Sequence, residues 1–369
     1  MSGLKKILII GSGITGITLA ERFASLGFDI SIVEKRNNIG GNCYDFIDKN
    51  GILIHKYGPH IFHTDYKDVW EYLSQFTKWI KYEHKVLGFI DNKYAPIPFN
   101  LNSLNIFFPE KANNLKLKLI ESFGSNKKIP ILELKKSKDH DLRILSDFIY
   151  KKVFLSYTKK QWGFSPEKID PSVISRVPVS ISFDDRYFQD KYQGIPKNGY
   201  TKMFEKMINK KKIKIKLKTK YNKKTEKLFD YIFYTGPIDE YFGYKFGKLD
   251  YRCFNIKNKT ISGESYQESA VVNYPDKKYK FTRVTEYKKL TQQKNKKTII
   301  GFEFPGNKGV IGWPILNNKN LSKLKKYSEE SKNFKKIFFV GRLGEFKYYD
   351  MDDAVKRSLD LVKFLKLKI

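Results

Sequence analysis

Arginine is rare in this 369-residue chain, and its placement points to anion binding. Only nine of the 71 basic residues are arginine, and the others are lysine. The planar guanidinium can hold a phosphate or carboxylate through two parallel hydrogen bonds, whereas lysine offers a single charged point. A chain so biased to lysine should keep arginine chiefly where that geometry matters, although a few could survive by chance. The first candidates for an anion site are Arg36, Arg176, Arg186, Arg283 and Arg342.

A second group of reactive residues is the segment HKYGPHIFHT at 55–64, which holds three of the five histidines. Its spacing is poor for zinc, and no cysteine or carboxylate pair accompanies it, so no metal is expected. A functional loop against a cofactor is favoured, with purely structural histidines as the alternative. The two cysteines, Cys43 and Cys253, form neither a disulfide framework nor a metal cluster, and we expect them to be inert in a reducing cytoplasm.

The elements that position these residues begin with a glycine turn, GSGITG at 11–16. An apolar strand is predicted at 6–10 before it, helical spacing follows from 14 to 26, and a second strand at 29–33 ends at Glu34. This βαβ pattern is typical of a dinucleotide site rather than an empty tight turn, because the helix N-terminus favours a pyrophosphate.

Each residue of this fingerprint has a physical role. Gly11 permits the tight turn, Gly13 lets backbone N–H groups approach a pyrophosphate, and Gly16 allows close packing of helix and strand. Glu34 is placed to accept a hydrogen bond from a ribose hydroxyl. A second glycine pair, in IGGN at 39–42, resembles that of flavoproteins of the glutathione-reductase and amine-oxidase type, which favours FAD over NAD.

Composition limits the classes of protein. The net charge of +32 is spread along the chain among Asn, Ile, Tyr and Phe, which indicates coding bias and a solvated basic surface rather than a nucleic-acid site. The field would still favour a small anionic substrate. Glycines interrupt the apolar run of 1–20, so we expect a buried strand and helix rather than a signal peptide, and no apolar stretch is long enough to span a membrane.

The rest of the chain predicts an α/β protein. Residues 101–175 carry helical spacing and should form an inserted bundle, while 251–304 shows short alternating runs of an antiparallel sheet. Further strands are predicted at 212–220, 230–235 and 336–340, and a helix capped by Asp350 runs to about 365. We predict a Rossmann-like FAD-binding domain at 1–80, 197–245 and 330–369, a helical bundle at 100–175 with a mobile substrate loop at 165–180, and an antiparallel β-sheet domain at 81–99, 176–196 and 246–329.

Nine ordered motifs make the chain similar to the bacterial UDP-galactopyranose mutase family almost from end to end. The resemblance implies a Rossmann-like FAD domain, a helical bundle and a six-stranded antiparallel sheet. The motifs are GSGITG at 11–16, EKRNNIGGN at 34–42, HKYGPHIFHT at 55–64, SYTKKQWG at 156–163, SRVPV at 175–179, DDRYFQDKYQGIPKNGYTKM at 184–203, YTGP at 234–237, FTRVTEYK at 281–288 and VGRLGEFKYYDMDD at 340–353.

The resemblance also implies a reaction. The family interconverts the pyranose and furanose forms of UDP-galactose without net redox, supplying furanose sugar for cell-surface glycans. Reduced FAD is required, and its N5 attacks the anomeric carbon to form a sugar adduct as UDP leaves. A homodimer and a UDP-linked sugar partner are the family expectation.

Site residues follow from the same motifs. Arg176, on the mobile loop, and Arg283 match two arginines that grip the diphosphate, and Arg342 matches an arginine beside the flavin. His63 is favoured as acting on the flavin or the substrate rather than as a purely structural residue. Asp350 matches a family carboxylate near the site, and its alternative role is to cap the start of its own helix. The substrate-binding set is Tyr157, Trp162, Arg176, Tyr187, Asn273, Arg283, Tyr348 and Asp350. The cofactor-binding set is Gly11, Gly13, Ile14, Thr15, Gly16, Glu34, Lys35, Gly41, Asn42, His60, Ile61, Gly341, Arg342, Asp350 and Met351.

Two departures leave the substrate open. Trp313 stands where many family members have a tyrosine that contacts phosphate, and Val153 stands where an aromatic residue often stacks on uracil. A TDP-linked, N-acetylated or 6-deoxy sugar is therefore an alternative. An amine-oxidase-type FAD oxidoreductase shares the first glycine unit but does not explain SYTKKQWG, SRVPV or FTRVTEYK. An idle nucleotide-sugar binder would not need to retain the arginines. Arg186 is expected at the surface.

Overall fold

The structure, a computed structural model, describes residues 5–171 and 177–366. The described chain divides into two compact units, each built from separated segments. Unit 1 comprises 1–82, 190–251 and 312–369, and unit 2 comprises 83–189 and 252–311. The predicted FAD-binding segments at 1–80, 197–245 and 330–369 fall within unit 1, while the helical segment and most of the large sheet fall into unit 2; the three-domain division stays a prediction.

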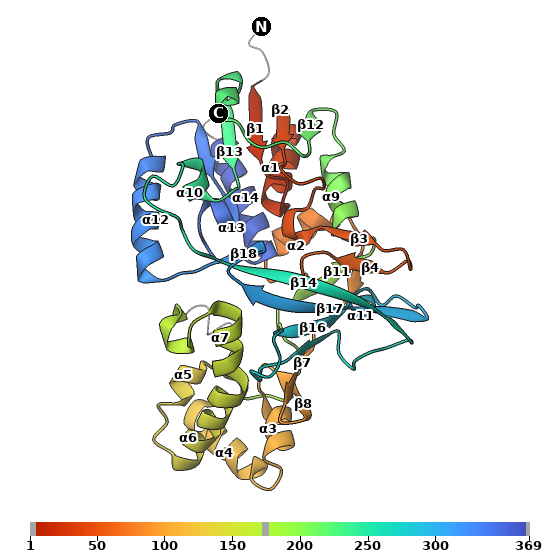
Figure 1. The fold of residues 1–369 in the computed structure, drawn as a ribbon, viewed down its shortest axis with the longest axis vertical. Helices are drawn as coiled ribbons and strands as arrows, with labels where there is room; N and C mark the ends of the chain where they lie inside the picture. The colour runs from red at the N-terminus through yellow and green to blue at the C-terminus, as the bar shows by residue number, and fades with distance from the viewer. Residues whose placement is uncertain (1–4, 172–176, 367–369) are drawn as a thin grey trace. The chain divides into compact units, whose positions relative to one another are not determined.

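Unit 1 is built on a parallel sheet with the strand order β12-β2-β1-β13-β19 (Figure 1). The central strand β1 is a continuous apolar run that is buried from Ile7 to Ile10, as expected where helices cover both faces of a parallel sheet. The edge strand β12 alternates lysine with half-buried isoleucine. The strands are β1 (Lys6–Ile10), β2 (Asp29–Val33), β12 (Ile213–Lys216), β13 (Tyr231–Tyr234) and β19 (Ile337–Phe339).

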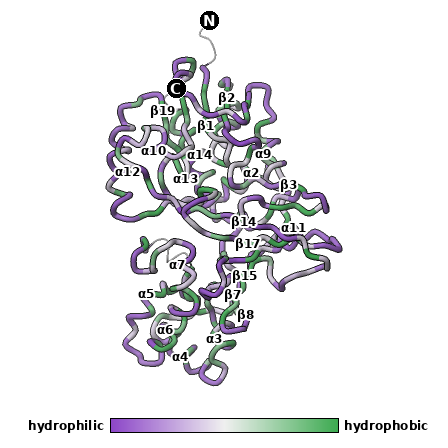
Figure 2. The backbone as a smooth tube through the Cα atoms, viewed as in Figure 1, coloured by the Kyte–Doolittle hydropathy of each residue, from purple (hydrophilic) through white to green (hydrophobic). Residues whose placement is uncertain are grey.

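Helices α1 (Ile14–Ser25) and α14 (Met351–Lys366) pack on this sheet through one apolar core. Leu19 and Phe23 of α1 lie with Leu361 and Leu365 of α14 and with β1 side chains. Figure 2 shows the hydrophobic colour along β1 and a mostly hydrophilic α12. The other helices of unit 1 are η1 (Gly41–Cys43), α2 (Lys67–Ser74), α9 (Tyr200–Ile208), η4 (Lys223–Leu228), α10 (Ile238–Tyr241), α12 (Asn318–Ser331) and α13 (Gly341–Gly344).

Two small antiparallel sheets complete unit 1. The order β5-β11-β6 places His63 opposite Gln193, and β3 pairs with β4. His55 and His63 therefore lie on paired strands, while His60 lies in the connection 56–61 between them. The strands are β3 (Asp45–Ile47), β4 (Leu53–His55), β5 (Phe62–Thr64), β6 (Trp79–Lys81) and β11 (Tyr192–Pro196).

Unit 2 contains the predicted helical bundle. Its core joins Leu104, Leu115, Leu145 and Ile149 from successive helices. Between α6 and α7 the chain forms a π-helix, η2, so the helical path is continuous but not uniform. The helices are α3 (Leu101–Phe107), α4 (Ala112–Phe123), α5 (Ile131–Leu134), α6 (His140–Ile149), η2 (Tyr150–Leu155), α7 (Ser156–Trp162), η3 (Pro166–Lys168) and α11 (Tyr287–Thr291), with a short β9 (Lys128–Ile129) and β10 (Val179–Ser180) pair.

The large sheet has the order β18-β14-β17-β16-β15-β7-β8. The sheet differs from the expected six-stranded antiparallel sheet in two ways: it has seven described strands, and β15 runs parallel to β7. The parallel pair arises because a long segment containing the helices separates β7 from β15, so no hairpin forces them to be antiparallel. The strands are β7 (Val86–Ile90), β8 (Lys93–Ile97), β14 (Tyr251–Ser262), β15 (Val271–Asn273), β16 (Arg283–Glu286), β17 (Lys297–Gly306) and β18 (Val310–Pro314). The predicted class, a Rossmann-like domain with helices and a largely antiparallel sheet, is confirmed.

Candidate functional site

The glycine turn of unit 1 is packed as the fingerprint requires. A Cβ added to Gly16 would lie 2.1 Å from the Gly11 carbonyl oxygen, and one added to Gly11 would lie 2.3 Å from Thr235 Oγ1. Gly11 also has φ +98°, a conformation that side chains disfavour. Both glycines are therefore required by the fold itself.

Gly13 is different, because the protein alone does not require a glycine there. Its backbone is extended (φ −71°) at the N-terminus of α1, and the nearest described atom to an added Cβ would be Gly41 Cα at 3.9 Å. The second glycine pair lies against this turn, since Gly40 N–H donates to the Ser12 carbonyl at 2.8 Å. The open face at Gly13, beside unpaired helical N–H groups, fits a pyrophosphate.

Glu34 lies at the end of β2 and turns back to the glycine turn. Its carboxylate accepts hydrogen bonds from Ser12 N at 2.8 Å and from Arg36 N at 2.8 Å, and the residue is 6 % exposed. Arg36 stacks over Tyr57 with Cζ 4.6 Å from the ring centroid, and its Nη2 donates to Asn42 Oδ1 at 3.0 Å. Arg36 Nη1 is buried without a hydrogen-bond partner among the described residues, which is the kind of donor that a bound anion would satisfy.

The motif VGRLGEFKYYDMDD at 340–353 contacts the N-terminal end of α1. A Cβ on Gly341 (φ +85°) would lie 2.8 Å from Thr15 Oγ1, so the two predicted cofactor residues are in contact. The Arg342 guanidinium donates to the Gly312 carbonyl at 3.0 Å and to the Tyr349 carbonyl, and it lies 5.6 Å from the centre of the Tyr348 ring. Arg342 therefore also anchors its own segment.

His63 is surrounded by carboxylates. Its Nδ1 lies 3.2 Å from Asp190 Oδ2, and its side chain is 14 % exposed. Burial disfavours the charged imidazole, but Asp190, together with Asp350 and Asp352, raises the pKa of His63 above its usual value. Burial, helped by Asp353, raises the pKa of the Asp352 carboxyl to about 6. The structure thus places in one cluster a histidine and a carboxyl group whose pKa values are both raised.

The remaining predicted cofactor residues lie around this core. His60 Nδ1 is 2.8 Å from the Gly58 carbonyl oxygen, and the neighbouring Ile61 is buried. Met351 Sδ lies 3.6 Å from Cys43 Sγ, and Lys35 is exposed. Asp350 directly precedes α14, where its N–H donates to the Asp353 carboxylate at 3.0 Å. The Asp353 carboxylate thus reaches back to the backbone at the helix start.

In unit 2, Arg283 is held by a buried carboxylate. Its Nε and Nη2 donate to Glu303 Oε2 at 2.9 and 2.7 Å, and Glu303 lies directly opposite it on β17. Burial opposes the charge of Arg283, but Glu303, with Tyr157 and Tyr187, raises the pKa of the guanidinium. The Arg283 side chain is 24 % exposed and that of Glu303 only 3 %, so the accessible edge of the pair is cationic.

The neighbours of Arg283 are the predicted substrate residues. Asn273 is its cross-strand partner on β15 and is 9 % exposed. Tyr157 and Trp162 lie on α7, and Tyr187 packs its ring 5.7 Å from His84. Since Tyr157 and Tyr187 both influence the charge of Arg283, these side chains form one polar and aromatic cluster around a guanidinium.

Other predicted residues have different surroundings. Arg176 lies outside the described residues. Arg186 has its guanidinium bound to Asp184 at 2.7 Å, as expected for a surface arginine. Val153 and Phe154 are buried in the bundle core, so neither offers an exposed face to a base. Trp313 is half-buried on β18.

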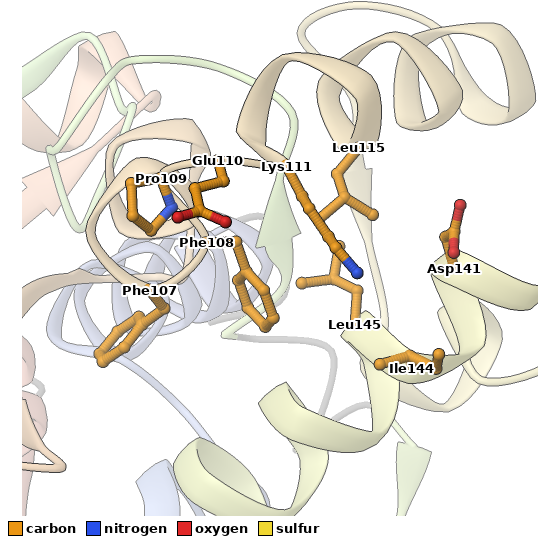
Figure 3. Close-up of a pocket in the computed structure, with 9 residues that line it drawn as sticks. All are labelled: Phe107, Phe108, Pro109, Glu110, Lys111, Leu115, Asp141, Ile144 and Leu145. Atoms are coloured by element: carbon orange, nitrogen blue, oxygen red, sulfur yellow. The ribbon is translucent and has the colours of Figure 1, made fainter.

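The chain also has a pocket that involves none of the predicted residues. Figure 3 shows its lining side chains, which come from the end of α3, the connection 108–111, the first turn of α4 and one face of α6. Among residues 5–171 and 177–366 no group of three or more His, Cys, Asp or Glu could hold a metal ion. Cys43 and Cys253 are buried and free, and burial raises the pKa of Cys43 to about 12, so its thiol is unreactive. No described helix has the length and apolar character needed to cross a membrane.

Sequence reasoning missed the acidic partners. Glu303 is the one charged residue in the apolar strand TIIGFEF, and such a residue in a buried strand indicates a partner. Asp190 and Asp352 fall within motifs, but nothing in their spacing relates them to His63. The predicted residues thus form two clusters, one in each unit.

Known proteins resemble the chain along its whole length. The protein-family model for UDP-galactopyranose mutase matches residues 152–348, and that for a Rossmann-like NAD(P)-binding domain matches 9–76. A probable UDP-galactopyranose mutase of Klebsiella pneumoniae is 33 % identical over 96 % of this chain and 93 % of its own length. The dTDP-fucopyranose mutase of Escherichia coli is 34 % identical, covering 97 % of both chains. The crystal structure of a reduced UDP-galactopyranose mutase superposes with a TM-score of 0.77 at 15 % identity, covering 99 % of this chain and 94 % of that one.

Proposed function

Because this chain belongs to the UDP-galactopyranose mutase family, we propose that it is a flavin-dependent isomerase that interconverts UDP-galactopyranose and UDP-galactofuranose. The observation that carries the proposal is the Arg283–Glu303 pair. A guanidinium fixed by a buried carboxylate, with its free edge beside Asn273 and two tyrosines, suits a nucleotide diphosphate.

The reaction requires UDP to leave the sugar and return to it. Negative charge develops on the diphosphate as the bond to the anomeric carbon breaks, and cations that are already oriented stabilise it without reorganising. We assign this role to Arg283, because Glu303 fixes its orientation, and to Arg176, which the motif SRVPV places in the family's second arginine position. Tyr157, Trp162 and Tyr187 would hold the nucleotide.

The cofactor is proposed to be FAD in its reduced form, which when bound supplies an electron-rich nitrogen nucleophile. The residues of unit 1 fit such a group. Gly13 leaves room for a pyrophosphate at the start of α1, and Arg36 has an unused buried donor. Glu34 Oε2 already accepts two bonds from Ser12, but Oε1 accepts only one, from Arg36 N, and can accept a second from a ribose hydroxyl. Arg342 supplies a fixed positive charge for an anionic reduced flavin.

His63 is proposed to hold a proton during ring opening. Its Nδ1 lies 3.2 Å from Asp190 Oδ2, and the surrounding carboxylates raise the pKa of His63, which favours the protonated imidazole. Tyr348 and Asp350 are proposed to contact the substrate from the same unit.

A related mutase activity on another nucleotide sugar is the second candidate. The dTDP-fucopyranose mutase of Escherichia coli covers as much of this chain at similar identity, and the buried Val153 offers no ring to a uracil. The homodimer expected from the family stays a prediction, which sedimentation would test. The cytoplasmic location, inferred from the sequence and from nucleotide-sugar chemistry, also stays a prediction, which cell fractionation would test.

One experiment tests the proposal. The purified protein should carry a yellow flavin, and after reduction with dithionite it should convert UDP-galactofuranose into UDP-galactopyranose, followed by chromatography. dTDP-fucofuranose, assayed in parallel, distinguishes the second candidate. Oxygen consumption with an amine, and no isomer from either substrate, would reject both mutase assignments in favour of an oxidase.

A further inference from the structure

Lys160 has four backbone carbonyl oxygens around its ammonium group, more than any other lysine among the described residues; the buried Lys288 has two. It lies on α7, in the motif SYTKKQWG, and its Nζ donates to backbone carbonyls only. The distances are 3.0 Å to the Asp276 oxygen, 3.2 Å to that of Tyr279 and 3.1 Å to that of Phe281, and the Tyr274 oxygen is also a partner.

These contacts form a cage of carbonyl dipoles around one cation. An ammonium has three N–H donors and shares them here among four oxygens, so its hydrogen-bonding capacity is fully used. Burial lowers the pKa of Lys160 to about 8, while the nearby Asp276 carboxylate opposes this shift. A lysine whose only role was to make the surface hydrophilic would keep its ammonium group hydrated rather than surrounded by backbone carbonyls.

The caged segment connects the two strands that carry the predicted diphosphate residues. Asn273 ends β15 immediately before Tyr274, and Arg283 begins β16 two residues after Phe281. The two residues are cross-strand partners. Lys160 therefore ties α7, which carries Tyr157 and Trp162, to the turn between Asn273 and Arg283.

A second cation fixes the same helix from its other side. Arg252, which is 8 % exposed, donates from Nε to the Gln161 carbonyl and from Nη2 to the Lys160 carbonyl, both at 2.6 Å. Its Nη1 donates to Asn307 Oδ1 at 2.6 Å. The end of α7 thus has little freedom to rotate, and the Lys160 side chain is aimed at the 274–281 turn.

We propose that Lys160 is a positioning residue for the nucleotide diphosphate, because its caged ammonium holds the Asn273–Arg283 turn against the helix that carries Tyr157 and Trp162. This inference rests on the proposed function. It assigns Lys160 no contact with substrate, so its loss should weaken UDP binding through the geometry of the turn and leave flavin binding unchanged.

The first test is a pair of matched variants measured by calorimetric titration of the flavoprotein with UDP. Lys160→Met has a side chain of similar length without N–H donors, and Lys159→Met changes the exposed neighbouring lysine on the same helix. The Kd for UDP should rise about tenfold or more in Lys160→Met and stay unchanged in Lys159→Met, with equal flavin content. A Kd equal to that of wild type in Lys160→Met would overturn the inference. Failure of the wild type itself to bind UDP would instead reject the proposed function.

Chemical rescue provides a readout that a general loss of stability would not give. In Lys160→Ala the four carbonyls are left without their cation, and an ethylammonium or propylammonium ion can donate to them. Added alkylammonium should lower the KM of this variant several-fold, whereas tetramethylammonium at equal ionic strength, which has no N–H group, should not. Equal effects of both ions, or no effect of either, would overturn the proposal even if Lys160→Met failed to fold.

Discussion

Replacement of Arg283 should separate what the Arg283–Glu303 pair does for stability from what it does for catalysis. Both guanidinium bonds end on one oxygen of a carboxylate whose side chain is only 3 % exposed. Removing the arginine would leave that charge buried and unpaired, at a cost of about 3–5 kcal/mol. We therefore expect Arg283→Ala to lower the free energy of unfolding by that amount, as measured by urea denaturation of the flavoprotein.

The compensating change is Glu303→Gln in the Arg283→Ala background. The amide is nearly isosteric with the carboxylate but uncharged, so the double variant should recover most of the lost stability. It should not recover mutase activity, because neither residue then supplies a cation to the diphosphate. Kinetics of the reduced enzyme with UDP-galactofuranose measure this directly.

Arg283→Lys completes the series. A lysine can keep one bond to Glu303, so the stability loss should be about 1 kcal/mol. It cannot bind the carboxylate and the diphosphate together, and losing one charge-assisted bond of about 1.5–3 kcal/mol lowers kcat/KM roughly 10–150-fold. Near-normal turnover in Arg283→Lys, or full turnover in the double variant, would show that Arg283 is structural and that the assignment is wrong.

Three further predictions concern unit 1. Gly13→Ala should change the unfolding free energy of the apoprotein by less than about 1 kcal/mol yet weaken flavin binding at least tenfold. Gly16→Ala should instead destabilise the apoprotein, because its Cβ would lie 2.1 Å from a carbonyl oxygen. Equal losses in both variants would contradict the assignment. Asp352 has a pKa raised to about 6, so the native protein holds a proton between about pH 4 and 6 that the unfolded chain does not hold. The free energy of unfolding should therefore fall as pH rises through that range. Asp352→Asn should increase that free energy by about 1–3 kcal/mol near pH 7.5 and leave it unchanged near pH 4, as denaturation at the two pH values would show. Cys43 should resist iodoacetamide in the native protein and react only after denaturation, as mass spectrometry would show.

The parts of the fold that could be predicted from the sequence are those specified locally. The strand, turn and helix at the N-terminus follow from apolar runs and glycines within a few turns of chain, and the structure places β1, α1 and β2 within a residue or so of the predicted bounds. The parallel β7–β15 pair could not be predicted in this way, because it depends on which distant strands become neighbours. The three-domain division stays a prediction, and its FAD-binding segments at 1–80, 197–245 and 330–369 lie within unit 1, which gathers 1–82, 190–251 and 312–369.

The candidate site shows the same limit. Motifs identified Arg283, but its orientation is set by Glu303, and that pairing exists only once the register of β16 on β17 is fixed. Lys160 was hidden for a different reason. In a chain with so many lysines the residue type carries little information, and only the carbonyls around Nζ distinguish this one.

The π-helix η2 limits how the chain can vary in length. Its wider turn accommodates an extra residue directly before α7, and each residue of an α-helix advances the direction of its side chains by about 100°. Deleting one residue from 150–155 would therefore restore a regular α-helix and leave Tyr157 and Trp162 facing nearly the same side of it. A single deletion in this short stretch should be better tolerated than a further insertion, which would turn both side chains by about 100° around the helix axis.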